Sequence, residues 1–274
     1  MVRGKPQVGV GLNPGFGERP RTDLAAVLRD VKAAGFDGVE AGLLCEGNAP
    51  AARALLEEHG LIQGSLHTGW SQSYRVDREI EYLSALGGKF VVVSGVGMER
   101  EDGLRPFEEA VETLDRVGAQ CREAGLTFCY HNHGWEFREF DGVAGLDRLL
   151  ELTDPSVVKL CLDVFWAQYG GRDPAALARR YLERVAYLHL KDLRYVGPEP
   201  RRRGVLHPVY PRLPLNGEAD YMELGRGEVD IPGVWGVVAP LNLPWMVYEQ
   251  DEARVPPAEA AAISRKYLRQ RLGI

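Results

Sequence analysis

Eight short apolar runs alternate with helix-like segments along the whole chain. Each run has the length and composition of a buried strand, and together they cover residues 8–12, 38–43, 62–67, 90–96, 126–131, 157–162, 185–190 and 245–249. Strands separated by helices indicate a parallel sheet with right-handed crossovers, and eight is the number that closes such a sheet into a barrel. We therefore predict an α/β chain folded as a single (β/α)8 barrel domain, for which 274 residues is an ordinary length.

The segments between these runs carry helix signals of their own. An apolar stripe at three- and four-residue spacing predicts an amphipathic helix over 104–124. Asp173 and Pro174 are typical of an N-cap followed by proline in the first turn of a helix. Gly35 and Gly125 stand where helices should end in left-handed caps before the next strand.

One connection is about twice the ordinary length and is rich in proline, glycine and arginine. It covers 193–229 and follows the seventh strand, so we expect it on the face where such barrels carry their active sites. Loops this long are usually lids, binding loops or contacts in a homo-oligomer, and we expect this one to cover the mouth of the barrel. Its basic run, Arg201 to Arg203, is most simply a solvated patch rather than a grip on a substrate phosphate.

Composition and charge exclude several classes of protein. A net charge of -6 argues against a surface for duplex nucleic acid. No apolar stretch approaches the ~18 residues of a membrane span, and no apolar signal region follows the N-terminus. The four cysteines show no CxxC spacing, and Cys129 and Cys161 lie inside predicted strands, so we expect no disulfide framework and a cytoplasmic location.

The segment 130–137 reads YHNHGWEF and directly follows a predicted strand. His131 and His133 have the period-two spacing that places both rings on one face of a strand, so we predict that they move protons in the site. Glu136 has the opposite parity to His133, although Gly134 can break the strand and let the chain turn.

Three further polar residues close hydrophobic strands at corresponding places. Asp163, His189 and Glu249 each follow an apolar run, and barrel enzymes place their chemistry at the carboxyl ends of strands. Carboxylates combined with imidazole suit one divalent ion, Mn²⁺, Mg²⁺, Zn²⁺ or Co²⁺. The alternative is that each residue caps a helix or satisfies loop backbone.

Other residues should line the same mouth. His67 and Glu40 are expected to bind substrate hydroxyl groups rather than metal, and Trp166 is expected to form an apolar wall against a sugar ring. Ordinary core packing is the alternative for Trp166. The chain has no GxSxG elbow, Walker loop, HExxH motif or dinucleotide fingerprint.

Taken together, these pieces resemble the xylose-isomerase-like TIM-barrel superfamily, the sugar phosphate isomerases and epimerases. The matching pieces run in the right order along nearly the whole chain and comprise residues 39–40, 130–137, 162–166, 189–192, 225–230 and 248–251. Lys191, inside one of them, becomes a further candidate for substrate binding. The resemblance implies one divalent metal held by residues after strands five to eight.

The resemblance maps the last three metal ligands onto Asp163, His189 and Glu249. The first ligand departs from the pattern, because ketose 3-epimerases carry a glutamate where this chain has a histidine-rich strand five. Either Glu136 supplies the fourth ligand after a turn, which we favour, or one of the strand-five histidines does.

We therefore expect a metal-dependent sugar isomerase or epimerase of carbohydrate metabolism that works through a metal-stabilised enediolate, with His133, His131 and Glu249 as candidate bases. The substrate would be a small sugar or sugar derivative. The alternative is a lyase or dehydratase, similar to inosose dehydratases or to enzymes acting on 3-keto sugars. More remote alternatives are an apurinic-endonuclease-like DNA repair enzyme and a non-catalytic binding protein.

Overall fold

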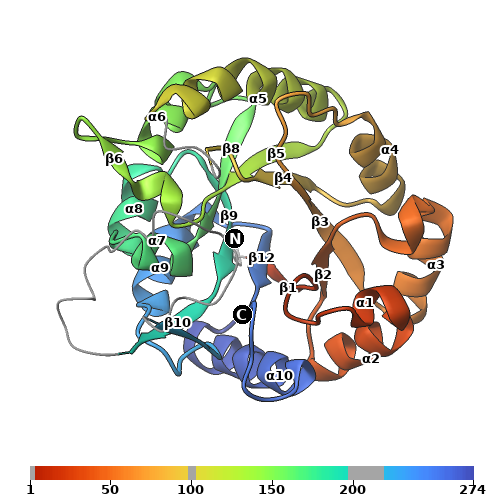
Figure 1. Ribbon diagram of the computed structural model, residues 1–274. Helices are drawn as coiled ribbons and strands as arrows, with labels where there is room; N and C mark the ends of the chain where they lie inside the picture. The colour runs from red at the N-terminus through yellow and green to blue at the C-terminus, as the bar shows by residue number, and fades with distance from the viewer. Residues whose placement is uncertain (1–3, 98–102, 197–218) are drawn as a thin grey trace.

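The eight predicted strands form a closed parallel barrel surrounded by helices (Figure 1). The computed structural model describes residues 4–97, 103–196 and 219–274. Around the barrel the strand order is β1-β12-β9-β8-β5-β4-β3-β2. The predicted (β/α)8 fold is therefore confirmed.

The barrel strands match the predicted runs to within a few residues at each end. Their bounds are β1 Gln7–Gly11, β2 Gly38–Ala41, β3 Ile62–Gly69, β4 Phe90–Ser94, β5 Thr127–His131, β8 Val158–Asp163, β9 Val185–Leu190 and β12 Trp245–Tyr248. No strand end differs from its prediction by more than two residues, and β12 ends one residue earlier than predicted. Glu249 thus lies just beyond β12 rather than inside it.

The helices between the strands are α1 Arg19–Thr22, α2 Leu24–Ala34, α3 Ala49–Glu58, α4 Asp77–Leu86, α5 Arg105–Glu123, α6 Gly145–Leu152, α7 Val164–Tyr169, α8 Pro174–Arg180, α9 Ile231–Val238 and α10 Pro257–Tyr267, with short turns η1 Leu44–Gly47, η2 Trp135–Phe137, η4 Ala239–Leu241 and η5 Leu268–Leu272. The predicted caps are present. Asp173 accepts hydrogen bonds from two backbone amides at the start of α8, and Gly35 ends α2 at φ 87°. Within the described ranges, no helix is both long and apolar enough to cross a bilayer.

Two small antiparallel ribbons interrupt the barrel pattern, one formed by β6 Glu139–Phe140 with β7 Val143–Ala144 and one by β10 Asp192–Tyr195 with β11 Ala219–Met222. The second ribbon contains the start and the return of the long connection predicted at 193–229. The basic run Arg201 to Arg203, within 197–218, lies outside the described residues. The carboxylate of Asp192 accepts hydrogen bonds from the backbone amides of Gly225, Gly227 and Val229 at 2.9–3.0 Å, which ties the return of the connection to the end of β9.

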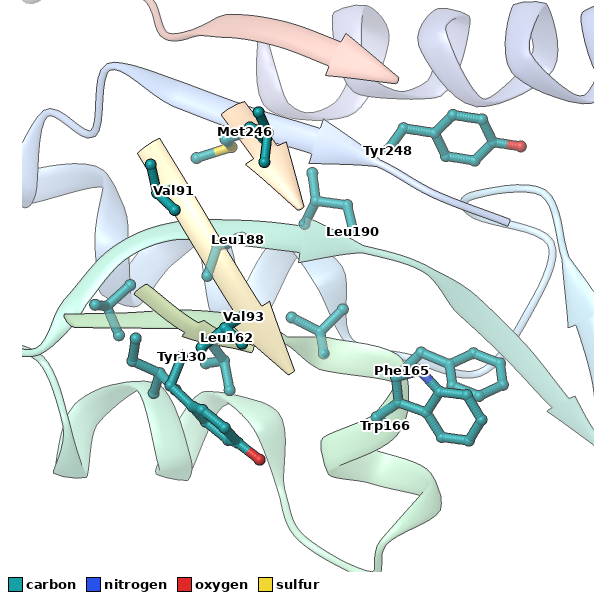
Figure 2. Close-up of a cluster of buried hydrophobic side chains, with 14 of the residues drawn as sticks. Val91, Val93, Tyr130, Leu162, Phe165, Trp166, Leu188, Leu190, Met246 and Tyr248 are labelled. Atoms are coloured by element: carbon teal, nitrogen blue, oxygen red, sulfur yellow. The ribbon is translucent and has the colours of Figure 1, made fainter. Parts of the chain in front are cut away.

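The core has two layers, because successive side chains of a strand point to opposite faces. One layer packs the outer faces of the strands against the helices, and Figure 2 shows part of it, with Val91, Leu188 and Met246 from three different strands. The second layer lies inside the barrel and consists of Phe90, Val92, Cys129, Cys161, Tyr187, Trp245 and Val247. The barrel is therefore filled rather than hollow at this level, and all four cysteines are free.

A β-bulge between β2 and β3 shapes the top of this inner layer. Val39 pairs with Gln63 but Glu40 pairs with Ser65, so Gly64 is the extra residue. A Cβ atom on Gly64 would lie 2.7 Å from the indole of Trp245, a distance that no side chain tolerates. The indole occupies that space and donates a hydrogen bond from Nε1 to the hydroxyl of Ser65 at 2.9 Å. The bulge thus turns the hydroxyl of Ser65 toward the lumen opposite Glu40.

Candidate active site

A cavity of about 670 Å³ lies at the carboxyl ends of the barrel strands. Six of the residues predicted from the sequence line it: Glu40, His67, His131, His133, Lys191 and Glu249. Asp163 and His189 are fully buried directly beside them. The barrel therefore brings together side chains from strands that are far apart in the sequence.

Asp163, His189 and Glu249 form one cluster, as predicted. The strand register places Asp163 opposite His189, and His189 opposite Val247, two residues before Glu249. Nδ1 of His189 lies 3.1 Å from Oε2 of Glu249 and 3.9 Å from Oδ2 of Asp163. Each residue offers one ligand atom within 4.8 Å of the other two.

The chemistry of this cluster fits a divalent ion. Oδ1 of Asp163 accepts a hydrogen bond from the amide of Trp166 and so caps α7, but Oδ2 is buried with no hydrogen-bond partner in the described part of the chain. A buried carboxylate oxygen without a hydrogen bond is costly, and the nearest cationic groups, Nζ of Lys191 at 3.6 Å and Nδ1 of His189 at 3.9 Å, lie beyond hydrogen-bond distance. Two carboxylates and one imidazole are ligands that Mn²⁺, Mg²⁺, Zn²⁺ or Co²⁺ accept. Asp163 therefore serves as a helix cap through one oxygen and is available as a ligand through the other.

Lys191 carries a buried positive charge against the same carboxylates. Its Nζ lies 2.7 Å from Glu249, 2.9 Å from Asp251 and 3.6 Å from Asp163. Burial opposes the charge, but the three carboxylates raise the pKa of Lys191 well above its usual value. Asp251 was not among the predicted site residues, and its hydrogen bond from Tyr221 (2.9 Å) links the site to the β10–β11 ribbon.

The pKa values of the two carboxylates are shifted in opposite directions. Burial raises the pKa of Asp163 to about 6, although Lys191 and His189 act against the shift. Burial also opposes ionisation of Glu249, but there Lys191 and His189 prevail and bring its pKa to about 2. Glu249 is thus ionised throughout the neutral range.

The two strand-five histidines lie at different depths. The ring of His131 is buried 4.5 Å from the ring of His189, whereas His133 is partly exposed to the cavity and stacks on Trp135 at 4.3 Å and 15°. Burial lowers the pKa of His133 well below its usual value, and Lys191 adds to the effect. Its Nδ1 is buried without a hydrogen-bond partner among the described residues, 4.0 Å from Oε1 of Glu136. A neutral imidazole ring can accept a proton.

Trp166 borders this histidine, although it is only 4% exposed. Its ring lies 5.5 Å from the ring of His133, and Nζ of Lys191 lies 5.6 Å from its centre. The indole therefore packs behind the residues that line the cavity. Whether it also meets a sugar ring stays a prediction.

Among the described residues, Glu136 does not belong to any group of three side chains whose ligand atoms lie within 4.8 Å of one another. Its Oε1 accepts a hydrogen bond from the hydroxyl of Tyr130 and its Oε2 accepts one from the backbone amide of His133, both at 2.8 Å. Burial raises its pKa to about 8. His131 does belong to such a group, with Cys161 and His189. The prediction that Glu136 is the fourth ligand therefore stays a prediction.

Glu40 and His67 meet at the floor of the cavity. Nδ1 of His67 lies 3.3 Å from Oε1 of Glu40, and its Nε2 is hydrogen-bonded to the hydroxyl of Ser94 at 2.9 Å. Ser94, Ser65 and Tyr187 were not predicted as site residues, because hydroxyl-bearing residues inside apolar runs give no local signal of a role in the site. Asn132 exchanges two hydrogen bonds with the backbone of Asp163, which fixes the end of β8.

Comparison with known proteins agrees with this architecture. The chain is 30% identical to an inosose dehydratase from Geobacillus kaustophilus over 93% of its own length and 89% of that protein. An inosose dehydratase from Clostridium tetani is 24% identical over 90% of the chain and 89% of its own length. Among solved structures, a sugar phosphate isomerase/epimerase from Parabacteroides distasonis superimposes with a TM-score of 0.75 at 19% identity, covering 98% of this chain and 95% of that one.

A family model described as a xylose isomerase-like TIM barrel matches residues 28–271. That span includes all the site residues described above. The chain belongs to the xylose isomerase-like TIM barrel family.

Proposed function

We propose that this enzyme is a metal-dependent dehydratase that removes water from a cyclic polyhydroxy ketone of the inosose class. The observation that carries the proposal is the similarity to inosose dehydratases along almost the entire chain, at up to 30% identity. The likeness to the sugar phosphate isomerase/epimerase structure supports the shared fold alone. A dehydratase therefore has more support than the isomerase or epimerase that the sequence led us to expect.

Asp163, His189 and Glu249 would hold the divalent ion, with Glu136 or His131 completing the shell. When bound there, the ion supplies a Lewis acid for the carbonyl and a neighbouring hydroxyl oxygen of the substrate. The supporting observations are the unpartnered Oδ2 of Asp163 and the spacing of the three ligand atoms.

His133 is the base that we assign to the first step. It lines the cavity and its lowered pKa keeps the ring neutral at pH 7, so it can remove the proton from the carbon next to the carbonyl. The electron pair of the C–H bond becomes a carbon–carbon double bond as the C–O bond at the next carbon breaks. The departing hydroxide takes up a proton and leaves as water.

Two further residues suit the remaining tasks. His67 lines the cavity and is connected to the hydroxyl of Ser94, so it can deliver the proton to the leaving hydroxyl group. Lys191 is held charged by three carboxylates and can donate a hydrogen bond to a substrate oxygen. An isomerase or epimerase would share the first proton removal but return the proton to carbon.

The test is a reaction in heavy water with the metal-supplemented enzyme and a panel of keto-inositols and keto-sugars, analysed by mass spectrometry and NMR. Loss of one water from a keto-inositol, abolished by chelator and by His133→Ala, is the expected result. A product of unchanged composition that carries solvent deuterium on carbon would refute the dehydratase and favour an isomerase or epimerase.

A further inference from the structure

Glu40 makes four contacts with polar groups although it is only 3% exposed. Its Oε2 accepts hydrogen bonds from the hydroxyl groups of Ser65 and Tyr187, at 2.6 and 2.7 Å. Its Oε1 lies 2.8 Å from Nε2 of His189 and 3.3 Å from Nδ1 of His67. One oxygen is therefore held by two hydroxyl donors, and the other faces two imidazole rings.

These contacts use one nitrogen of each ring and leave the other free for a different partner. His189 turns Nε2 toward Glu40 and Nδ1 toward Glu249 and Asp163. His67 turns Nδ1 toward Glu40 and Nε2 toward the hydroxyl of Ser94. Glu40 thus contacts one nitrogen of each ring. The other nitrogen faces Glu249 and Asp163 in His189, and the hydroxyl of Ser94 in His67.

We propose that Glu40 is a positioning residue that holds the ring of His189 in the orientation that turns Nδ1 toward Glu249 and Asp163, and holds His67 in the same way, rather than a ligand of substrate hydroxyl groups. Its Oε1 lies 2.8 Å from Nε2 of His189, on the side of the ring opposite the candidate metal ligands. Carboxylates commonly fix metal-binding histidines in this way. The inference rests on the metal site of the proposed function.

Distances argue against the other use of these groups, a second ion between Glu40, His67 and His189. Two ligands bound ~2.1 Å from a tetrahedral ion lie about 3.4 Å apart. Nε2 of His189 and Oε1 of Glu40 fall well below that spacing, at 2.8 Å, and the distances from Nδ1 of His189 to Glu249 (3.1 Å) and Asp163 (3.9 Å) lie closer to it. Nε2 of His189 has no hydrogen-bond partner among the described residues, so its contact with Oε1 of Glu40 is electrostatic.

The local fold is arranged to hold this carboxylate. The bulge at Gly64 brings Ser65 opposite Glu40, and Trp245 in turn donates a hydrogen bond to Ser65. Tyr187 reaches Oε2 from β9, two residues before His189. Three strands thus fix the carboxylate before it contacts the rings.

The experiment compares Glu40→Gln with the wild-type chain and with Tyr187→Phe as the matched control. In Glu40→Gln the amide oxygen can still accept from Ser65 and Tyr187, which turns the amide N–H groups toward the rings. The neutral amide then offers no negative charge to the ring of His189, which loses the contact that holds it in place. We expect metal affinity, measured by chelator competition without substrate, to fall ~10–100-fold, with a clearly smaller loss for Tyr187→Phe.

Ring-nitrogen NMR and metal content provide independent readouts. In Glu40→Gln the His189 ring signals should change, and wild-type protein should hold one ion per chain. Unchanged metal affinity with only a raised KM would overturn the proposal in favour of a substrate ligand. Two ions in the wild type and one in Glu40→Gln would overturn it in favour of a second metal site.

Failure of the proposed function gives a different result. If the wild-type chain binds no divalent ion or dehydrates no substrate, the proposed function is refuted. The NMR signals of the His189 ring still report whether Glu40 orients that ring, and signals unchanged in Glu40→Gln overturn the inference. If Glu40→Gln does not fold, Glu40→Asp takes its place, because aspartate keeps the charge but has a side chain one methylene shorter. A metal affinity equal to that of the wild type in this variant would also overturn it.

Discussion

Replacing Lys191 by methionine should destabilise the metal-free protein strongly. Methionine keeps much of the length of the side chain but removes the ammonium group that lies within 3.6 Å of Asp163, Glu249 and Asp251. Three buried carboxylates would then face each other with His189 as their remaining cationic neighbour. Because the carboxylates hold the pKa of Lys191 well above its usual value, the ammonium group is charged in the wild type at neutral pH.

The expected size follows from burial. Removing one partner of a buried ion pair costs about 3–5 kcal/mol, because the remaining charge is left uncompensated. For a chain of this length each kcal/mol lowers Tm by roughly 2–4 °C, so Lys191→Met should unfold about 10 °C below the wild type. The deficit should shrink in acid, because carboxylates that lose their cation take up protons more readily. A divalent ion bound by the variant should restore part of its own stability, about 2.7 kcal/mol relative to the metal-free variant at a hundredfold excess over its Kd.

Thermal unfolding followed by calorimetry or circular dichroism measures the difference, with Lys159→Met as the matched control. Lys159 is only half-buried on β8 and donates its hydrogen bond to a backbone oxygen rather than to a carboxylate. The control should change stability by no more than about 0.5 kcal/mol. An equal Tm for the two variants, with or without metal, would refute the view that Lys191 balances the carboxylates.

The remaining predictions concern the metal shell and the base. Asp163→Asn, His189→Ala and Glu249→Gln should each lose tight metal binding with an unchanged circular dichroism spectrum, and wild-type metal content in any two of them would contradict the assignment. Glu136→Gln should lose metal affinity if Glu136 completes the shell, whereas His133→Ala should keep the metal and lose deuterium exchange at the substrate carbon; the opposite pair of results would exchange the two roles. Burial lowers the pKa of His133, so protonation of this ring should not lower kcat/KM between about pH 8 and about pH 6.5. A fall in kcat/KM near pH 6.5 that His133→Ala removes would disprove the neutral base.

The fold could be predicted because its signals are local. Each strand appears as an apolar run and each helix as a stripe with its own caps, so Asp173 and Gly35 could be placed without knowledge of the rest of the chain. The positions of Asp163 and His189 follow from the same pattern, since parallel strands bring their carboxyl ends to one side of a barrel. Adjacent strands then align these two residues opposite one another.

The missing parts of the site depend on register and on contacts between distant segments. Ser65 meets Glu40 only because of the bulge at Gly64, and a run of apolar and small residues does not reveal a one-residue shift. Asp251 has the parity of Glu249, but its partner Lys191 lies 60 residues earlier in the chain, so nothing nearby in sequence marks the pair.

Glu136 illustrates a different limit. Strand parity aimed it away from the lumen, and the turn after Gly134 instead places its carboxylate against Tyr130 and the amide of His133. The direction of a side chain beyond a strand end is decided by that turn, which the alternating pattern does not describe.

The filled interior of the barrel has a consequence for traffic through the enzyme. Phe90, Tyr187, Trp245 and their neighbours fill the lumen beneath the cavity, so the described part of the chain leaves no second channel through the centre of the barrel. We expect substrate and product to pass through the same opening at the carboxyl ends of the strands. A product that stays bound therefore blocks the next substrate directly, and competitive rather than mixed inhibition by product is the kinetic pattern that this architecture favours.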